Sequence, residues 1–328
     1  MPGSGSLPKN ILLVKTSSLG DVIHNLPVVS DLRAHFAGVG IDWVVEESFA
    51  DIPRLHPGVR DIIPVALRRW RKRLWSPATW AEIGAARHQI GAREYDAIID
   101  TQGLLKSAWL ARLARGPRLG HHADSAREPL AARFYDAGLF VPRTLHAVER
   151  NRRLAAAALG YSPGPELDYG LPRQAENQHS LTVVLLTATS RADKLWPEAH
   201  WVSLGRALAR RGLTPLLPGG NPLERQRALR LASQIPGAQA IPPMCLADLA
   251  RLLAHARLAV GVDTGLSHLA AAVDTPIVAL HTATDPGLTG VLGQGWVRNL
   301  GGKGQVPTVQ EVLNQIAHFL PRSASASA

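Results

Sequence analysis

Residues 260–272 read VGVDTGLSHLAAA, and this stretch decides the fold. The run 257–262 is typical of a buried strand, and 266–273 is typical of a short helix rich in small residues. A strand, a tight turn with a glycine and a helix together bring backbone N–H groups towards a phosphate. Asp263 or Thr264 could equally be an ordinary N-cap of the helix, so both interpretations stay open on this stretch alone.

A second turn of the same kind lies near the N-terminus. The run ILLVK at 11–15 predicts a buried strand, TSSLGD at 16–21 a turn, and 22–36 a helix with Pro27 in its first turns. Ligands of parallel sheets lie outside the carboxyl ends of the strands, and both turns fall at such ends. We therefore expect two binding edges, one in each half of the chain.

Strands and helices alternate through both halves, which predicts parallel sheets with helices on their faces. Between the halves, residues 160–178 are rich in proline and glycine and lack apolar periodicity. We therefore expect an α/β fold with two Rossmann-like domains that face each other. The expected parts are an N-terminal domain over 1–165, a linker over 166–180, a C-terminal domain over 181–306, and a closing helix over 307–320 that packs back on the N-terminal domain.

The same patterns assign the individual elements. The expected strands are 11–15, 41–46, 61–66 and 96–100, followed by 182–186, 214–217, 238–241, 258–262 and 276–281. The expected helices are 22–36, 79–90, 104–114, 130–137 and 147–159, followed by 199–211, 223–234, 246–255, 266–273 and 308–320.

Composition limits the class of protein. A chain of 328 residues with 46% hydrophobic residues fits two globular domains of ordinary size. The single cysteine, Cys245, excludes a disulfide framework and fits a reducing compartment. No run approaches the roughly 18 apolar residues of a membrane span, and the first ten residues lack the pattern of a secretory signal.

The charge balance points to anionic partners. The formal net charge is +10, mostly from arginine, and a basic surface attracts nucleic acid, anionic lipid or an anionic substrate. A charge run is usually a solvated face, but tryptophans among the charges also suit a membrane interface. No helix-turn-helix, RRM or zinc-finger pattern is present, so we expect no nucleic-acid partner. The run consists of Arg68, Arg69, Arg71, Lys72 and Arg73, interleaved with Trp70 and Trp75.

The common cofactor motifs are absent from the sequence. Gly20 and Gly265 each stand alone in their turns, so neither turn is a GxGxxG dinucleotide fingerprint. There is no GxxxxGK[ST] phosphate loop, no HExxH and no paired-cysteine motif. We therefore expect neither a metal nor an organic cofactor, and the chemistry must come from another arrangement of residues.

Several runs together resemble a known family. KTSSLGDVIHNLP near the start and VDTGLSHLAAA near the end are similar to the glycosyltransferase family that includes the lipopolysaccharide heptosyltransferases. Six further runs resemble the branch of that family that adds the first heptose, and the matches extend from residue 11 to residue 319. These runs are IDWVVEE, IPVALRRWRK, YDAIIDTQGLLKSA, AREPLAARFYDAG, DKLWPEAHW and TDPGLTG.

The resemblance implies the GT-B architecture and inverting transfer of L-glycero-D-manno-heptose. The donor would be ADP-heptose, and the acceptor the first 3-deoxy-octulosonate (Kdo) of Kdo2-lipid A, with no metal required. Such an enzyme would be cytoplasmic and peripheral on the cytoplasmic face of the inner membrane, at an anionic membrane surface. The alternatives are another GT-B enzyme, such as the second heptosyltransferase or a nucleotide-sugar epimerase, and a non-catalytic sugar-nucleotide binder.

By resemblance, the first turn and the basic segment serve the acceptor. Asp21 would be the general base that takes the proton of the acceptor hydroxyl, although an N-cap is its other possible role. Arginine suits an acceptor that carries a carboxylate and phosphates. The residues expected to bind the acceptor are Ser17, Ser18, Gly20, Arg68, Arg71 and Arg127.

The second half of the chain would bind the donor. Lys194 would contact the donor phosphates and stabilise the leaving group, so it is expected to be catalytic as well as donor-binding. The sequence reads TATS at 187–190, where the family pattern has two adjacent threonines. Each of these residues also has an alternative role. Lys194 could be a solvated loop lysine, and Glu224 could pair with the helix dipole in a first turn. Met244 could be a core residue, and His268 a structural histidine. The expected donor-binding residues are Thr189, Ser190, Lys194, Glu224, Met244, Asp263, Thr264, Gly265 and His268.

Overall fold

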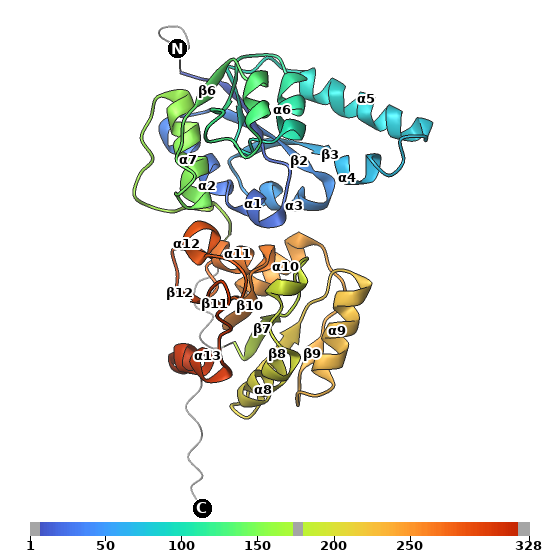
Figure 1. The fold of residues 1–328 in the computed structure, drawn as a ribbon, viewed down its shortest axis with the longest axis vertical. Coiled ribbons are helices and arrows are strands. Elements are labelled where there is room, and N and C mark those ends of the chain that lie inside the picture. The colour runs from blue at the N-terminus through green and yellow to red at the C-terminus, as the bar shows by residue number, and fades with distance from the viewer. Residues whose placement is uncertain (1–6, 173–179, 321–328) are drawn as a thin grey trace, which may run out of the picture. The chain divides into compact units, whose positions relative to one another are not determined.

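The computed structural model describes residues 7–172 and 180–320, which form two compact units divided between Leu171 and Pro172. Each unit holds one six-stranded parallel sheet with helices packed on it (Figure 1). The expected α/β class with two Rossmann-like domains is therefore confirmed. The division falls inside the expected linker, of which residues 173–179 lie outside the described part of the chain.

The sheet of the first unit has the strand order β3-β2-β1-β4-β5-β6. This is the Rossmann order, in which the chain reverses direction across the sheet between β1 and β4. Loops that follow these two strands therefore diverge and leave a crevice at the carboxyl edge. The strands are β1 (Asn10–Val14), β2 (Gly40–Glu46), β3 (Val59–Val65), β4 (Ala97–Asp100), β5 (Arg118–His121) and β6 (Ala137–Leu139).

The helices of the first unit depart from expectation in two places. The single helix expected over 22–36 is divided, because Pro27 cannot continue a helix and stands instead in the first turn of the second one. The helix expected over 130–137 is a 3-10 helix, and β6 begins at its expected end. The helices are α1 (Leu19–Ile23), α2 (Leu26–His35), η1 (Glu47–Phe49), α3 (Asp51–Arg54), α4 (Leu67–Trp70), α5 (Pro77–Gly91), α6 (Leu105–Arg112), η2 (Pro129–Phe134) and α7 (Ala147–Leu159).

A buried ion pair fixes α7 against α2. The Arg152 guanidinium donates from Nε and Nη2 to the two carboxylate oxygens of Asp31, each at 2.8 Å. Both side chains are buried, and removing one partner of such a pair leaves an unpaired charge in the interior. The pair therefore holds in register the neighbouring residues of α7, Arg150 and Asn151, which lie at the site described below.

The second unit repeats the topology of the first. Its sheet has the order β12-β11-β10-β7-β8-β9, so the reversal falls between β7 and β10. All its pairings are parallel. The strands are β7 (Thr182–Leu186), β8 (Thr214–Leu217), β9 (Gln239–Ala240), β10 (Leu258–Val262), β11 (Ile277–His281) and β12 (Val297–Gly301).

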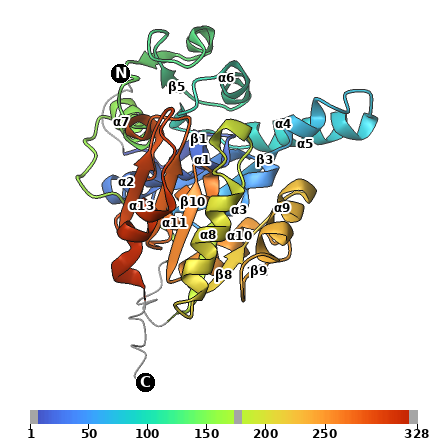
Figure 2. The ribbon, with the colours of Figure 1, turned by 60° about the horizontal axis from the view of Figure 1, so that its bottom comes forward.

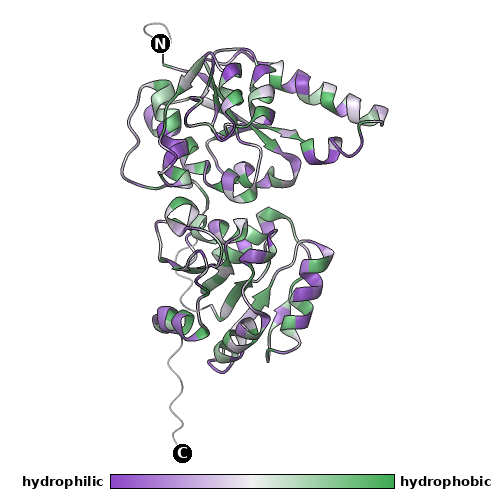
Figure 3. Cartoon of the chain, viewed as in Figure 1, coloured by the Kyte–Doolittle hydropathy of each residue, from purple (hydrophilic) through white to green (hydrophobic). Residues whose placement is uncertain are grey.

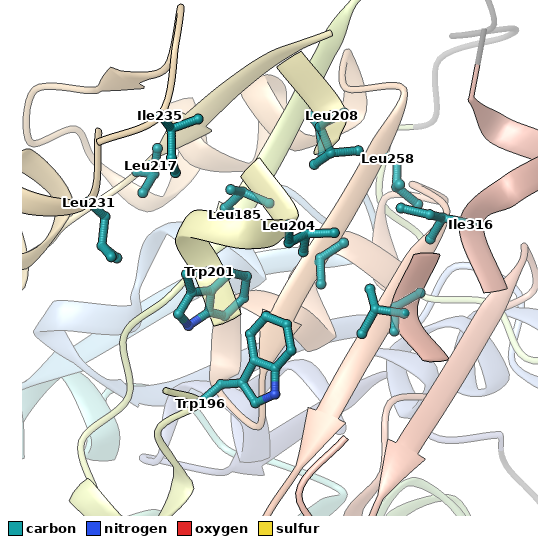
Figure 4. Packing of buried hydrophobic residues seen from close by; sticks show 14 of the residues in the cluster. Leu185, Trp196, Trp201, Leu204, Leu208, Leu217, Leu231, Ile235, Leu258 and Ile316 are labelled. Carbon is teal, nitrogen blue, oxygen red and sulfur yellow. The ribbon is translucent and has the colours of Figure 1, made fainter. Parts of the chain in front are cut away.

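Two tryptophans centre the core of the second unit (Figure 4). Trp196 and Trp201 are fully buried, and their rings meet edge to face with centroids 4.8 Å apart. The Trp196 Nε1–H also donates to the Pro307 carbonyl at 2.8 Å. The helices of this unit are η3 (Ala192–Lys194), α8 (Glu198–Ala209), α9 (Pro222–Ala232), α10 (Leu246–Ala254), α11 (Gly265–Ala272), α12 (Pro286–Thr289), α13 (Val309–Ile316) and η4 (Ala317–Phe319).

The C-terminal helix belongs to the second unit. Val312 and Ile316 of α13 are fully buried in the same core as the two tryptophans, and α13 packs against α8 and β11. The core of the second unit therefore receives the buried face of this helix, whereas the expectation was that the helix packs back on the N-terminal domain. The amphipathic pattern identified a buried face correctly, but it carries no information about which sheet covers that face.

Apolar residues concentrate in the strands of both sheets, which Figure 3 shows in green. Strands β1, β4, β10 and β11 are buried along nearly their whole length, as expected for central strands of a parallel sheet covered on both faces. Within residues 7–172 and 180–320, no helix is long and apolar enough to cross a lipid bilayer.

Candidate functional site

The turn after β1 holds Asp21 in a fixed position at the start of α1. The backbone N–H of Ser18 donates to Asp21 Oδ2 at 2.8 Å, and the Ser18 hydroxyl donates to the same oxygen at 3.0 Å. Asp21 is half-buried and lies in the first turn of α1. The Asp21 carboxylate therefore takes part in the capping box at the N-terminus of α1, as the capping alternative predicted. These two contacts do not exclude a role as a base, because each carboxylate oxygen can accept more than one hydrogen bond.

Gln102, in the loop after β4, clamps this turn from the other side of the crevice. Its Oε1 accepts from the Thr16 backbone N–H at 2.7 Å and from the Thr16 hydroxyl at 2.8 Å. Its Nε2 donates to the Ser17 carbonyl at 3.0 Å. Gln102 is in turn held by Asp100, whose Oδ1 accepts the Gln102 backbone N–H at 2.8 Å. One buried side chain thus joins the two loops that flank the topological switch point.

Two lysines border the same turn. Lys106 donates to the Ser17 hydroxyl at 2.8 Å, and Lys15 donates to the Thr101 carbonyl at 2.8 Å and to Asn151 Oδ1 at 3.2 Å. Burial lowers the pKa of Lys15, and the negative charge of Asp21 opposes this shift. Burial also lowers the pKa of Lys106, in part with the help of nearby arginines.

Three arginines complete a cationic group around Asp21. Burial lowers the pKa of Arg150 on α7, while Asp21 acts in the opposite direction. Arg68 and Arg127, two of the expected acceptor residues, both help to lower the pKa of Lys106. The charges of Arg68 and Arg127 therefore act at the carboxyl edge of the first sheet, where Lys106 lies. We refer to Lys15, Lys106, Arg68, Arg127 and Arg150 as the cationic group.

His121, at the carboxyl end of β5, responds to the same positive field. Burial lowers its pKa to about 4, and the charges of Lys15 and Arg150 act in the same direction. The imidazole is therefore neutral at pH 7. Burial is the larger cause of this shift, and the smaller contributions of Lys15 and Arg150 show that their positive charges act at His121.

In the second unit, Asp263 at the end of β10 organises the carboxyl edge. Its Oδ2 lies 2.8 Å from Lys194 Nζ and accepts the Thr284 hydroxyl at 2.6 Å. The Thr189 hydroxyl donates to the Asp263 carbonyl at 3.1 Å. Thr189 and Lys194 come from the loop after β7, and Thr284 comes from the loop after β11. Three loops of neighbouring strands therefore converge on one residue.

The carboxylate of Asp263 is ionised although it is largely buried. Burial alone would raise its pKa, but the hydrogen bonds from Lys194 and Thr284 and the charges of Lys194 and His268 lower it below its ordinary value. The Lys194 ammonium is thereby held next to the start of α11. His268, one turn into α11, is buried as well.

The start of α11 is a turn with limited room for side chains. Thr264 occupies the N-cap position in extended conformation, and its side chain makes no capping hydrogen bond to the described helix. The Ser267 hydroxyl instead donates to the Val262 carbonyl at 2.7 Å, and a Cβ on Gly261 would come within 2.3 Å of that hydroxyl oxygen. The capping alternative therefore does not account for Thr264.

The remaining expected donor residues follow along the same edge. Glu224 lies in the first turn of α9, after β8, and its carboxylate accepts the Gly220 N–H at 2.9 Å. The β9–α10 loop carries half-buried Met244. Because β9, β8, β7 and β10 are consecutive neighbours, their loops form a row about 14 Å long. Such a row suits an extended ligand such as a nucleoside diphosphate sugar.

Most of the expected residues lie at the carboxyl edge of one of the two sheets, but several of their partners were not predicted. Gln102 and Lys106 lie in the run YDAIIDTQGLLKSA, and their position directly after a strand was the available signal. Arg150 and Thr284 carry no comparable signal, because a helix and a separate loop bring them in. Ser190, in the loop after β7, and Arg71, directly after α4, are exposed. Within the described residues, no hydrogen bond or ion pair is seen that holds either side chain at the carboxyl edge of its sheet.

The arrangement defines what chemistry is available. The first unit offers a carboxylate base inside a cationic group, and the second offers an ammonium, hydroxyls and a helix N-terminus for phosphates. Among the residues that the structure describes, no cluster of three His, Cys, Asp or Glu side chains could hold a metal ion. The ammonium, hydroxyls and helix N-terminus of the second unit suit a diphosphate leaving group.

Comparison with known proteins supports this interpretation of the site's chemistry. Residues 83–314 match the profile of the family described as glycosyltransferase family 9 (heptosyltransferase). Lipopolysaccharide heptosyltransferase 1 of Pseudomonas aeruginosa is 48% identical over 293 residues, which cover 88% of this chain and 82% of the relative. Lipopolysaccharide heptosyltransferase 1 of Escherichia coli K12 is 47% identical over 295 residues, which cover 87% of this chain and 91% of the relative.

Solved structures agree with the sequence relatives. Escherichia coli heptosyltransferase WaaC with ADP matches with a TM-score of 0.87 at 44% identity, over 94% of this chain and 99% of that one. WaaC with ADP-2-deoxy-2-fluoro heptose matches over the same shares with a TM-score of 0.84 at 42% identity. The fold and the site define a glycosyltransferase of the GT-B class. The chain belongs to glycosyltransferase family 9, the heptosyltransferases.

Proposed function

We propose that this enzyme transfers L-glycero-D-manno-heptose from ADP-heptose to the first Kdo of Kdo2-lipid A, with inversion at the anomeric carbon. The observation that carries the proposal is that each unit has its own polar cluster at the carboxyl edge of its sheet: Asp21 with the cationic group in the first unit, and Lys194, Asp263 and Thr284 in the second. Identity of 47–48% to two lipopolysaccharide heptosyltransferase 1 enzymes supports the choice of substrates.

The donor binds along the carboxyl edge of the second sheet. The backbone N–H groups at the start of α11, with Thr264 and Gly265, receive the diphosphate. Lys194 neutralises the charge that develops on the departing ADP, and Asp263 aligns the ammonium for that task. Glu224 hydrogen-bonds the ribose, and Met244 contacts the adenine. Thr189, Ser190 and His268 complete the contacts to phosphates and sugar.

The acceptor binds at the carboxyl edge of the first sheet. Its Kdo carboxylate and lipid A phosphates carry negative charges that Lys106, Arg68, Arg127 and Arg150 complement. Asp21 takes the proton of the acceptor hydroxyl as its oxygen attacks the anomeric carbon, and ADP leaves with the electrons of the broken bond. Ser17, Ser18 and Gly20 line the turn around the base, and Arg71 adds a further contact to acceptor phosphate.

The acceptor and the charge balance together suggest where the enzyme acts. A lipid acceptor lies in a membrane, and the net charge of +10 favours an anionic surface. We therefore infer that the enzyme works as a peripheral protein on the cytoplasmic face of the inner membrane, without a nucleic-acid partner.

The substrates are tested by following ADP release from ADP-heptose in the presence of Kdo2-lipid A, lipid A without Kdo, or the acceptor that already carries one heptose. The proposal predicts release only with the first of these acceptors, and a product with inverted anomeric configuration. Release only with the acceptor that already carries heptose would instead indicate the second transferase of the pathway.

The acceptor contacts have their own test. Replacing Arg150 by Ala removes one cation from the acceptor edge and none from the donor edge, so the KM for the acceptor should rise about ten-fold or more while the KM for ADP-heptose stays unchanged. Steady-state kinetics with each substrate varied in turn measures both. A rise confined to the donor KM would show that the cationic group serves the wrong substrate in this proposal.

A further inference from the structure

The hairpin formed by α4, the connecting turn and the start of α5 projects from the first unit. Both ribbon views show α5 extending past the sheet, with the turn of residues 71–76 at the far end (Figures 1 and 2). We call residues 71–80 the hairpin tip. Among the acceptor residues above only Arg71 lies in the tip, and no step of the transfer has been assigned to the others.

The base of the hairpin is firmly anchored. Trp70 is buried in the core of the first unit, and its Nε1–H donates to Glu82 Oε2 at 2.7 Å. Arg69 forms ion pairs with Glu47 at 3.0 Å and with Glu82 at 2.8 Å. Trp70 is therefore a structural residue, and the expectation that it contacts a membrane is wrong. Arg69 is likewise engaged within the protein.

The tip, in contrast, exposes large apolar side chains. Trp75 is 99% exposed, and Trp80 and Leu74 are 59% and 47% exposed. The Trp80 Nε1–H donates to the Leu74 carbonyl at 2.8 Å, which keeps this carbonyl paired and holds the turn against the first turn of α5. The tip therefore presents three apolar side chains on a well-defined turn.

The tip also carries only positive charge. Lys72 and Arg73 are exposed beside the apolar side chains, and no acidic residue occurs between positions 71 and 81. Indole rings favour the boundary between water and acyl chains, and lysine or arginine beside them attracts anionic headgroups. An exposed tryptophan and a leucine flanked by cations match this boundary in both polarity and charge.

We propose that the hairpin tip docks the enzyme on an anionic phospholipid bilayer. Trp75, Leu74 and Trp80 enter the interfacial layer, while Lys72 and Arg73 contact lipid phosphates. The inference rests on the proposed function only in that a membrane acceptor explains why such a contact exists. The docking itself requires neither Kdo nor lipid A, so it can be tested without either.

The test measures co-sedimentation of the full chain with vesicles of phosphatidylglycerol and phosphatidylcholine that contain no lipid A. Trp75→Ala should lower the partition coefficient at least about ten-fold, because this indole is the most exposed of the three large apolar side chains of the tip. The double variant Lys72→Ala/Arg73→Ala should lower it about thirty-fold at low salt, since each cation contributes about five-fold. Pure phosphatidylcholine vesicles should bind much more weakly.

Matched variants away from the tip serve as controls. Trp109, on α6, is 45% exposed, and Trp109→Ala should leave vesicle binding unchanged. Arg210→Ala/Arg211→Ala removes two consecutive exposed arginines from the second unit and should change binding less than two-fold. Equal losses in the control and tip variants would overturn the proposal, because they would indicate general rather than local attraction.

A soluble acceptor separates docking from catalysis. With Kdo-bearing lipid A stripped of its acyl chains, Trp75→Ala should keep the kcat and both KM values of the parent enzyme, whereas with acceptor embedded in vesicles its rate should fall. A raised KM for the stripped acceptor would place the tip in the acceptor site and overturn the docking role. If transfer were absent in every enzyme form, the proposed function would fail, while the vesicle data would still decide the docking.

Discussion

At the scale of single residues, Gln102 stabilises the turn of residues 16–21, which carries Asp21. Replacing it by Ala removes three hydrogen bonds and leaves the buried Thr16 N–H without its partner, which should cost about 1–3 kcal/mol of stability. Because the turn carries Asp21, we expect kcat to fall about ten-fold while the KM for ADP-heptose is unchanged. Steady-state kinetics with urea unfolding measures both effects.

The control for this variant is Gln89→Ala, which changes an exposed glutamine on α5 and should alter neither quantity. An effect of Gln102→Ala on stability alone, with kcat preserved, would contradict the positioning role. In that outcome Gln102 would be a structural residue of the switch point and no more.

Asp263 provides a pH-dependent test. Its folded-state pKa lies below the unfolded value of about 3.9, so its contribution to stability is complete above that value and is lost as pH falls through the folded pKa. Asp263→Asn should therefore destabilise the protein by about 2 kcal/mol at pH 7, and the difference from the parent should shrink below about pH 4. Thermal unfolding at a series of pH values measures it.

The comparison variant is Asp193→Asn, which breaks an exposed ion pair with Arg191 and should change stability far less than Asp263→Asn at every pH, because solvent screens exposed pairs. A difference between parent and Asp263→Asn that stays constant down to pH 3 would show that the carboxylate is not the stabilising form.

At the scale of elements, α13 tests the assignment of the C-terminal helix. Ile316 is fully buried in the core that contains Trp196 and Trp201, so Ile316→Ala should cost about 2–5 kcal/mol. Asn314, two residues earlier, is exposed, and Asn314→Ala should change stability by less than about 0.5 kcal/mol. Tryptophan fluorescence during urea unfolding reports on this core directly. Equal costs for the two variants would contradict the packing of α13 described above.

Elements with strong periodic patterns could be predicted from the sequence, and short ones could not. Strands β1 and β10 are continuous apolar runs, which survive any tertiary context. Strands β5, β6 and β12 were not predicted, because they have three to five residues and include glycine or charged residues. Their identity as strands comes from pairing with neighbours, which no local pattern encodes.

The candidate functional residues also divide into those that a sequence pattern could predict and those that only packing brings to the site. Asp21 lies in the first turn of α1, and Lys194 and Asp263 follow β7 and β10, so strand-end position and family resemblance could assign each residue to the carboxyl edge of its own sheet. Arg150 and Thr284 reach the two edges from α7 and from the loop after β11, and their contribution depends on packing. Trp70 shows the opposite error, because its place within a charged run gave no sign of the buried bond to Glu82.

At the scale of the whole molecule, the chain contains the same sheet topology twice, with the reversal at β1/β4 and again at β7/β10. Each copy carries different groups at its carboxyl edge: a carboxylate among cations in the first, and an ammonium, hydroxyls and a helix start in the second. In the proposed function, this division lets the chain hold an anionic substrate at each edge. It also means that the two functions should be separable by mutation.

The central claim is that Asp21 acts on the acceptor proton and takes no part in holding the donor. The direct measurement is Asp21→Asn, which keeps the shape of the side chain and removes the base, followed in parallel by ADP release and by calorimetric titration with ADP-heptose. The account predicts that kcat falls about 10²–10⁴-fold while the Kd for ADP-heptose changes less than about two-fold. Preserved transfer, or a loss of donor binding that accounts for the loss of rate, would contradict it.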